Sequence, residues 1–509
     1  MSADSGADAR LFESRHLAAD VKNLAVRGGI LKMASQGVRF GLRIAGLIVM
    51  ARLVPPAETG VYAMSAAFMG LVAWFRDMGL TMATVQRAEI NHALISTLFW
   101  INVAIGLGLA AMTALAAPLL SWFYGEPRLT MITLAIGGTY ILAGLGAQHQ
   151  ALLQRHMRFG VLESINIAAQ LAGAAAMLVS AWYGAGAWSF VLNLVVLHAV
   201  LTVLMWAFAG WRPGLPRRNT GARSMLRFGR DLSGYHLVNY VHHHLDNILI
   251  GRFCGPEALG FYVKAYGLLK IPLIQVGDPL SNVVLPALSR LQDDPVRFRG
   301  YFLKALRGVL LAGMPVVAFT FVEAREIVLM LLGARWLPVV PIFQALAPAA
   351  FLALPHMVSN WLFTSLGRTD RQFRSGTGVM IVAAAAFGVG LPWNATGVAA
   401  AYSAAYCLLI LPTLAYAAKG TPVSLGDLGR SIWPPTAVAV LCAAVMLPLK
   451  SALPLPEAPV VRFVVHGALY SLFYAGAWAA TQAGRDFVRG VARPVVEAAR
   501  NFLARRRSA

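Results

Sequence analysis

Apolar stretches about 20 residues long recur in this chain from Gly28 to Gly484, bounded by Arg, Pro or Gly. An α-helix needs this length to cross the hydrocarbon core of a bilayer. The segment MIVAAAAFGVGL at 380–391 is typical, and it lacks the alternating polarity of a transmembrane β-strand. Only 13% of the 509 residues are charged, against roughly a quarter in soluble domains. The sequence therefore predicts an all-α integral membrane protein.

The apolar stretches predict fourteen membrane-spanning helices. The first six are expected at residues 28–53, 57–75, 93–120, 130–150, 160–182 and 187–210. The other eight are expected at residues 229–252, 257–288, 303–323, 340–365, 376–393, 396–417, 430–449 and 460–482. The external connections are short, so they leave no room for the large external domain expected of a membrane polymerase or ligase.

The formal net charge of +21 is distributed unevenly between the two sides of the predicted bundle. Of the 43 Lys and Arg residues, 31 fall in segments on the side of the N-terminus, seven on the opposite side and five inside spans. Cytoplasmic segments of membrane proteins carry such an excess. The distribution predicts that both termini are cytoplasmic, and the charge needs no nucleic-acid partner to explain it.

Two connections between spans share a sequence at an offset of 200 residues. ARLVPPAETGVY at 51–62 and GRFCGPEALGFY at 251–262 align without a gap, with Arg, Pro, Gly and Tyr identical at four positions. Six spans separate the copies, and an even number restores the same orientation. The two halves are therefore predicted to be parallel repeats about an axis normal to the membrane.

The first span carries polar and charged residues at helical spacing. Lys32, Gln36, Arg39 and Arg43 follow at i, i+4, i+7 and i+11, so they lie on one face of the helix. A charge inside a bilayer costs roughly 2.5–3.5 kcal/mol, so these side chains are expected to face a cavity or a partner. We interpret them as a cationic stripe that binds an anion. The alternative is that Lys32 extends to the inner surface and Arg43 pairs with an acid elsewhere.

The same offset of 200 places a polar face on the seventh span. It comprises His236, Asn239 and His243, with Asp246 and Asn247 further along the helix. Consecutive histidines point about 100° apart on a helix, so the HHH run at 242–244 does not predict a metal site. Histidine titrates near physiological pH, which would permit proton coupling, and plain hydrogen bonding is the alternative.

The eighth span adds Lys264, Tyr266 and Lys270, and prolines recur in it at 272, 279 and 286. Each proline removes a helical hydrogen bond, so this helix is expected to be bent or broken. The tenth span repeats the spacing at 341, 348 and 355. Bent helices suit a rocking transporter, while curved helices in a static bundle are the alternative.

Charged residues end two of the spans at the predicted inner side. They are Arg76 and Asp77 after the second span and Asp278 in the eighth. We interpret them as a candidate cytoplasmic gate, with ordinary surface charges as the alternative.

Motifs for enzyme chemistry are missing from the sequence. It has no GxxxxGK[ST], GxSxG, HExxH or CxxC segment. The spacing of its three cysteines, Cys254, Cys407 and Cys442, fits neither a disulfide framework nor a zinc site. We therefore expect no enzyme activity, no cofactor and no bound metal.

Segments in both halves resemble a known family. They are ARLVPPAETGVYAMSAAF and RDMGL in the first half, and LDNILIGRFCGPEALGFYVKAYGLLKIP and LPALSRLQDD in the second. On these segments the chain is similar to the Wzx-type oligosaccharide flippases, in the polysaccharide transport branch of the MOP superfamily. The resemblance implies two six-helix lobes around a central cavity, plus two additional helices.

The resemblance also implies a function. Members of this family move undecaprenyl-diphosphate-linked sugar repeat units from the inner to the outer leaflet of the bacterial inner membrane, for exopolysaccharide or lipopolysaccharide biosynthesis. A polymerase and a chain-length regulator are the implied partners. The resulting expectation is a cytoplasmic segment at 1–27, a first lobe at 28–211, a basic linker at 212–228, a second lobe at 229–418, two further helices within 419–484 and a basic cytoplasmic tail at 485–509.

Two sets of residues are predicted to line the cavity. The cationic, substrate-binding set is Lys32, Arg39, Arg43, Lys264 and Lys270. The polar set is Gln36, His236, Asn239, His243, Asp246, Asn247 and Tyr266. A cation-coupled multidrug exporter of the related branch is an alternative function, but it would be expected to carry carboxylates where Asp246 stands almost alone. A non-transporting scaffold is the other alternative.

Overall fold

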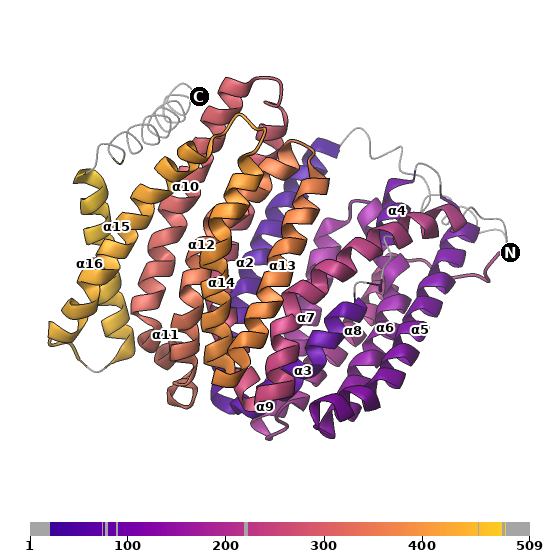
Figure 1. Cartoon of the computed structure of the whole chain (residues 1–509). Coiled ribbons are helices and arrows are strands. Elements are labelled where there is room, and N and C mark those ends of the chain that lie inside the picture. The colour runs from indigo at the N-terminus through magenta and orange to yellow at the C-terminus, as the bar shows by residue number, and fades with distance from the viewer. Residues whose placement is uncertain are drawn as a thin grey trace, which may run out of the picture. The chain divides into compact units, whose positions relative to one another are not determined.

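The computed structural model describes residues 21–73, 75–76, 80–87, 90–217, 222–456, 458–480 and 484. For residues 21–35, 83, 222–243, 272, 276 and 278 it describes the backbone alone. The described residues form helices and short connections (Figure 1). They divide into two compact units, one comprising Met1–Val263, Leu331–Trp336 and Phe387–Val398, the other Lys264–Met330, Leu337–Ala386 and Ala399–Ala509.

The first unit is built around a group of long helices. They are α2 (Val21–Leu53), α3 (Pro56–Ala73), α5 (His92–Tyr124), α6 (Arg128–Arg155), α7 (Phe159–Trp182) and α8 (Trp188–Ala209), with the short α4 (Leu80–Gln86) between α3 and α5. Helix α6 contacts α3, α4, α5, α7 and α8, and α2 packs along α7. The first part of α9 (Ala222–Ser289) also belongs to this unit.

Local sequence signals determine where α5 begins and ends. The side chain of Asn91 accepts a hydrogen bond from the backbone N–H of Leu94, which caps the first turn. Gly125 ends the helix at φ 70°, in the left-handed conformation that glycine adopts without strain. The connection to α6 is then only a few residues long, so the two helices are antiparallel neighbours.

Glycines allow α5 and α6 to pack at close range. A Cβ atom added to Gly106 of α5 would lie 2.6 Å from the carbonyl oxygen of Tyr140, and one added to Gly144 of α6 would lie 2.6 Å from that of Asn102. Small residues at such positions are the usual means of bringing membrane helices together. The close approach gives the first unit a rigid pair of helices against which α8 packs.

The second unit contains the rest of α9 and most of the remaining helices. The remaining helices are α10 (Pro295–Val322), α11 (Ala324–Leu331), α12 (Val339–Ser365), α13 (Thr369–Gly390), α14 (Asn394–Ala418), α15 (Leu425–Ala452) and α16 (Pro459–Ala480), with short 3₁₀ turns η2 (Ala334–Trp336) and η3 (Leu391–Trp393) whose residues belong to the first unit. Leu331 of α11, residues 387–390 of α13 and residues 394–398 of α14 also belong to the first unit. Helix α10 contacts α12, α15 and α16.

Charged side chains connect α15 and α16 to α10 and α11. Near one end, Arg299 donates two hydrogen bonds to Asp427, at 2.8 and 2.7 Å. Near the other, Glu323 is fully buried and lies 3.0 Å from Nδ1 of His466 and 3.7 Å from Nζ of Lys450. The two helices that follow the predicted second lobe are therefore bound to it by ion pairs as well as by apolar packing.

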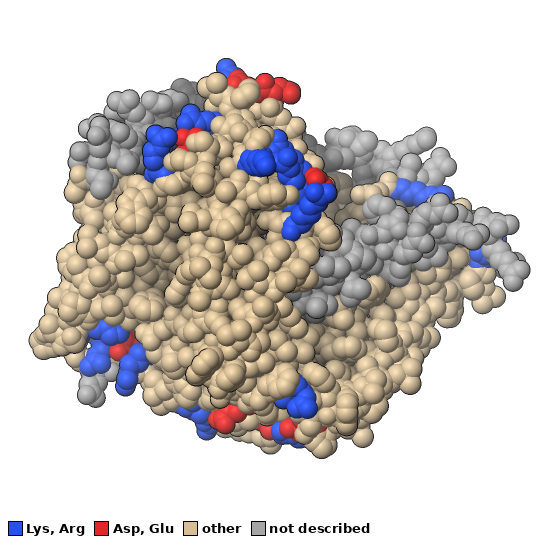
Figure 2. Space-filling view, in the orientation of Figure 1, with Lys and Arg blue, Asp and Glu red and all other residues tan. Residues whose placement is uncertain are grey.

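The distribution of charge identifies a multi-pass membrane protein. Figure 2 shows Lys, Arg, Asp and Glu gathered toward the ends of the helices, with uncharged surface over their middles. Nine helical segments within the described ranges are long and apolar enough to cross a membrane. Each of the fourteen expected spans overlaps a helix, although the count of fourteen spans stays a prediction.

Helix α9 covers the expected pair of spans at 229–252 and 257–288. It runs from Ala222 to Ser289 with one non-helical residue, Gly255, at φ 85° and ψ 176°. Two helices meet at this kink, so Gly255 lies in the expected connection between the two spans. The bend predicted from the prolines is present, since the axis turns by 46° between His244–Gln275 and Pro279–Ser289. The lobe boundaries at 28–211 and 229–418 stay predictions.

Candidate functional site

The described side chains of the cationic stripe differ in exposure. Gln36 and Arg43 are exposed, and Arg39 is partly buried. Arg39 and Arg43 lie four residues apart on α2, so they project from the same face on successive turns. The side chain of Lys32 lies outside the described part of the chain. Two guanidinium groups are thus presented close together within a helix that is otherwise apolar at this depth.

Arg39 forms an ion pair with Glu163 of α7. Its Nη1 atom donates to Oε2 of Glu163 at 2.9 Å, and the two side chains are 21% and 13% exposed. The sequence alternative paired Arg43 with an acid, but Arg43 has no ion pair with any residue that the structure describes. Glu163 lies within the expected fifth span, so this span carries a carboxylate in addition to Asp246 of the seventh.

The two copies of the repeated sequence contact each other within the first unit. A Cβ atom built on Gly60 of α3 lies 1.7 Å from the carbonyl oxygen of Pro256, and one built on Gly260 of α9 lies 2.0 Å from that of Pro56. The contact is reciprocal, as expected when a two-fold axis relates two copies. We call these four residues the Gly–Pro contact. Only glycine permits it, because any side chain at 60 or 260 would collide with backbone.

Further bonds hold the chain around this contact. Asp246 is 6% exposed and accepts a hydrogen bond of 2.9 Å from the hydroxyl of Tyr262, which joins the parts of α9 on either side of Gly255. The indole of Trp336 donates to the carbonyl oxygen of Ala51 at 2.6 Å. Asp246, predicted to line the cavity, is thus placed beside the Gly–Pro contact.

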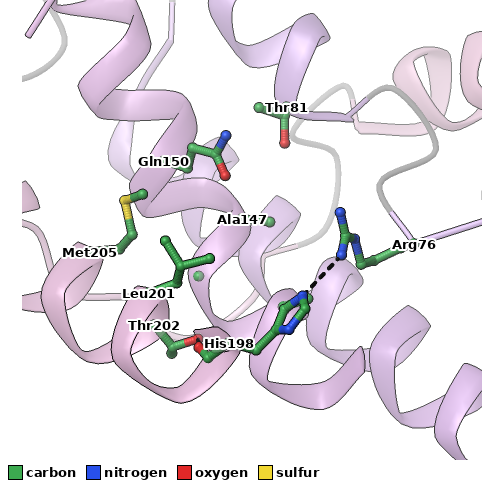
Figure 3. Close-up of a pocket in the computed structure, with 10 residues that line it drawn as sticks. Arg76, Thr81, Ala147, Gln150, His198, Leu201, Thr202 and Met205 are labelled. Carbon is green, nitrogen blue, oxygen red and sulfur yellow. Dashed lines mark hydrogen bonds between the residues drawn. The ribbon is translucent and has the colours of Figure 1, made fainter. Parts of the chain in front are cut away.

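A cavity of about 190 Å³ lies between α6, α8 and the segment that follows α3 (Figure 3). Arg76, Gln150, His198 and Thr202 contribute its polar lining. Nη1 of Arg76 and Nε2 of His198 are 3.3 Å apart, and Nδ1 of His198 lies 2.9 Å from the carbonyl oxygen of Leu194. Because arginine can only donate, Nε2 accepts and Nδ1 carries the proton. Arg76 is therefore held at the cavity by a neutral imidazole.

The predicted lysines belong to the second unit. Lys264 is partly buried, and Nζ of the exposed Lys270 lies 5.8 Å from the ring centroid of Tyr266, within the range of a cation–π contact. Arg39 and Arg43 belong to the first unit, so the expected opposition of lysines and arginines stays a prediction.

The remaining predicted site residues are only partly described. Asn247 is partly buried, and its backbone N–H donates to Asp246. Asp77 and the side chains of His236, Asn239, His243 and Asp278 lie outside the described residues. The gate and the proton-coupling hypothesis therefore stay predictions. Among the residues that are described, no group of three or more side chains is arranged to hold a metal ion.

The sequence comparisons point to polysaccharide biosynthesis. The family model described as polysaccharide biosynthesis protein matches residues 49–341, more than half of the chain. The lipopolysaccharide biosynthesis protein WzxC of Escherichia coli K12 is 27% identical over 336 residues, 66% of this chain and 68% of that protein. The teichuronic acid biosynthesis protein TuaB of Bacillus subtilis 168 is 26% identical over 308 residues, 60% and 64% of the two chains. The matched region spans about two thirds of each relative.

Solved structures show the fold. The lipid II flippase MurJ in an inward closed conformation superposes with a TM-score of 0.69 at 15% identity, covering 92% of this chain and 99% of that one. A multidrug resistance MATE transporter of the MOP superfamily, in an inward-facing conformation, gives 0.59 at 13% identity, covering 74% and 93%. The predicted all-α membrane fold is confirmed, and the chain shares the fold of these two transporters.

Proposed function

Because the chain belongs to the polysaccharide biosynthesis protein family, we propose that it is a flippase for undecaprenyl-diphosphate-linked oligosaccharide repeat units. It would move them from the inner to the outer leaflet of the bacterial inner membrane, for exopolysaccharide or lipopolysaccharide biosynthesis. The observation that carries this proposal is the pair Arg39 and Arg43 on one face of α2. Two guanidinium groups inside a membrane helix suit an anion with several oxygen atoms, because each group binds phosphate oxygens in a bidentate manner.

The Gly–Pro contact supplies a gate for such transport. If both termini are cytoplasmic, residues 54–56 and 254–256 lie at the external side, so the contact closes the protein toward the outer leaflet. The diphosphate would then bind Arg39 and Arg43 from the inner side. Separation of Gly60 from Pro256, and of Gly260 from Pro56, would open the path outward.

Other predicted residues complete this scheme. Lys264 and Lys270 would also bind the anionic head of the substrate, and Arg76 would stand at the cytoplasmic entrance beside the cavity with His198. A polymerase and a chain-length regulator would act on the delivered repeat units at the outer leaflet. The protein itself would transport without making or breaking covalent bonds.

A multidrug exporter is the less favoured function. Exporters of organic cations need a carboxylate that is available to the substrate. Among the described residues of the first unit, Glu163 is an acid in contact with the stripe, and it already forms an ion pair with Arg39. A non-transporting scaffold would have no use for the costly charges in α2.

Replacing either arginine by alanine tests the proposal. Arg39→Ala and Arg43→Ala should each abolish polymer export in a strain that depends on this gene, while the protein inserts at normal abundance. Lipid-linked repeat units should accumulate in the inner leaflet, because synthesis continues without transport. Arg39→Lys should also impair export, since an ammonium group cannot bind phosphate in a bidentate manner.

Arg430→Ala is the matched control. Its side chain is 79% exposed near the start of α15, so its loss changes the net charge equally without touching the stripe. Export should match wild type. Wild-type export by both stripe variants would show that Arg39 and Arg43 do not bind the substrate.

A further inference from the structure

The ion pair between Arg39 and Glu163 joins a predicted substrate-binding residue to a residue with no other assigned role. The bonded atoms are 2.9 Å apart, and neither side chain is fully buried, at 21% and 13% exposure. Glu163 follows Phe159, where α7 begins, by about one turn. The two groups are therefore in contact but remain reachable by a ligand.

Arg39 is partly buried in a membrane helix, where a counter-charge lowers the cost of its own charge. An isolated charge in surroundings of low polarity is expensive, and a nearby carboxylate removes most of the cost. With no substrate present, Glu163 supplies that charge to Arg39. A diphosphate that binds the guanidinium of Arg39 supplies more negative charge than the carboxylate of Glu163. Arg39 then no longer needs Glu163 as its counter-ion.

We infer that Glu163 is an exchangeable counter-ion, which occupies Arg39 in the empty transporter and is displaced by the anionic head of the substrate. The inference rests on the proposed function. Displacement would favour a diphosphate, which replaces the lost ion pair with two or more charge-assisted bonds. A neutral headgroup gains nothing by displacing the acid. Return of Glu163 to Arg39 would also help to expel the substrate at the outer leaflet.

The packing of α2 on α7 does not depend on this ion pair alone. Met50 of α2 and Val54, which directly follows this helix, form a buried apolar cluster with Ala181 of α7. Gly46 of α2 also lies against Met177 of α7, since a Cβ atom built on Gly46 would be 3.6 Å from the terminal methyl of Met177. Removing the carboxylate should therefore leave the helices in place, so that its effect on binding is measurable.

Binding of undecaprenyl diphosphate, without sugars, to the full chain in lipid nanodiscs tests the inference. Glu163→Gln should bind this probe about fivefold more tightly than wild type, because a partly buried ion pair no longer competes. Arg39→Ala alone should bind the probe weakly. Adding Glu163→Gln to Arg39→Ala should not increase the affinity for the probe, because the effect of Glu163 acts through Arg39. Binding of neutral undecaprenol should be the same in all variants. Polymer export by Glu163→Gln should fall, because release is slower.

Glu126→Gln is the matched control, since it removes one acid of the first unit that pairs with Arg128 outside the stripe. It should bind the probe as wild type does. If Arg39→Ala weakens binding but Glu163→Gln leaves it unchanged or weaker, the pair is structural and this inference is wrong, while the proposed function stands. If undecaprenyl diphosphate binds no better than undecaprenol to wild type and Glu163→Gln alike, the proposed function itself fails.

Discussion

Adding one methyl group to the Gly–Pro contact should open the proposed external gate. In Gly60→Ala, the new Cβ would lie 1.7 Å from the carbonyl oxygen of Pro256. A carbon and a carbonyl oxygen normally approach no closer than about 3.3 Å, so α3 and α9 must separate by about 1.6 Å at this point. The obstacle is backbone, which cannot rotate aside as a side chain would.

The size of the effect follows from the cost of overpacking. Extra methyl groups in packed interfaces cost about 1–3 kcal/mol, and a clash with rigid backbone belongs at the upper end. This cost falls on the closed state alone. Since about 1.4 kcal/mol changes an equilibrium tenfold, a cost of 2–3 kcal/mol should raise the ratio of open to closed protein roughly 30- to 140-fold.

Spin labels on exposed positions of the two repeats would measure that ratio. Arg52 and Glu257 are both exposed, and cysteines there can carry nitroxides in a background without the three natural cysteines. Pulsed dipolar spectroscopy should show a longer-distance population that grows in Gly60→Ala. Gly108→Ala is the control, because a Cβ atom at Gly108 meets nothing within 4 Å. Identical distance distributions in wild type and Gly60→Ala would refute the assignment of the gate.

Two further predictions concern the second unit and the topology. Glu323→Leu should lower the free energy of unfolding by about 3 kcal/mol, because it leaves the buried His466 and the partly buried Lys450 without their acid; an unchanged thermal midpoint in detergent would contradict this. A phosphatase fused after Ala509 should be inactive and one fused after Pro454 active, since the charge asymmetry predicts that both termini are cytoplasmic; activity after Ala509 would contradict the fourteen-span topology.

Helix positions could be predicted from the sequence because the bilayer imposes one length and one polarity on every span. The expected range 93–120 overlaps α5, and 340–365 almost coincides with α12. Short elements escaped prediction for the same reason, since α4 and α11 are too short to span a membrane. The seventh and eighth expected spans meet within α9 at a kink, because one glycine at φ 85° is enough to redirect the chain.

The repeat is the feature in which sequence and structure agree at the level of single residues. Gly60 and Gly260 were identified by their identity at an offset of 200, and each contacts the proline of the other copy. Both copies of the repeat have glycine at this position because the reciprocal contact leaves no room for a side chain at 60 or 260. The pairing of Asp246 with Tyr262 was not foreseen, since it depends on the angle of α9 at Gly255.

The ion pair between Arg39 and Glu163 was not predicted, although the cost of a charge inside a span indicates that Arg39 needs an acid nearby. Arg39 inside a span requires a counter-charge, and Glu163 is an acid in a neighbouring expected span. Helical periodicity relates residues within one helix and does not show which residues of two helices meet. The structure was therefore needed to show that Arg39, and not Arg43, pairs with Glu163. The contact of Arg76 with His198 was inaccessible for the same reason.

Translocation by the purified protein tests the flippase proposal most directly. Proteoliposomes loaded with an undecaprenyl-diphosphate-linked repeat unit would be assayed for how fast the sugar becomes accessible to an impermeant glycosidase on the other side. Wild-type protein and Arg430→Ala should transfer the lipid at equal rates, and Arg39→Ala should match empty liposomes. Equal transfer by Arg39→Ala and wild type, or no transfer by wild-type protein with a functional fold, would contradict the account.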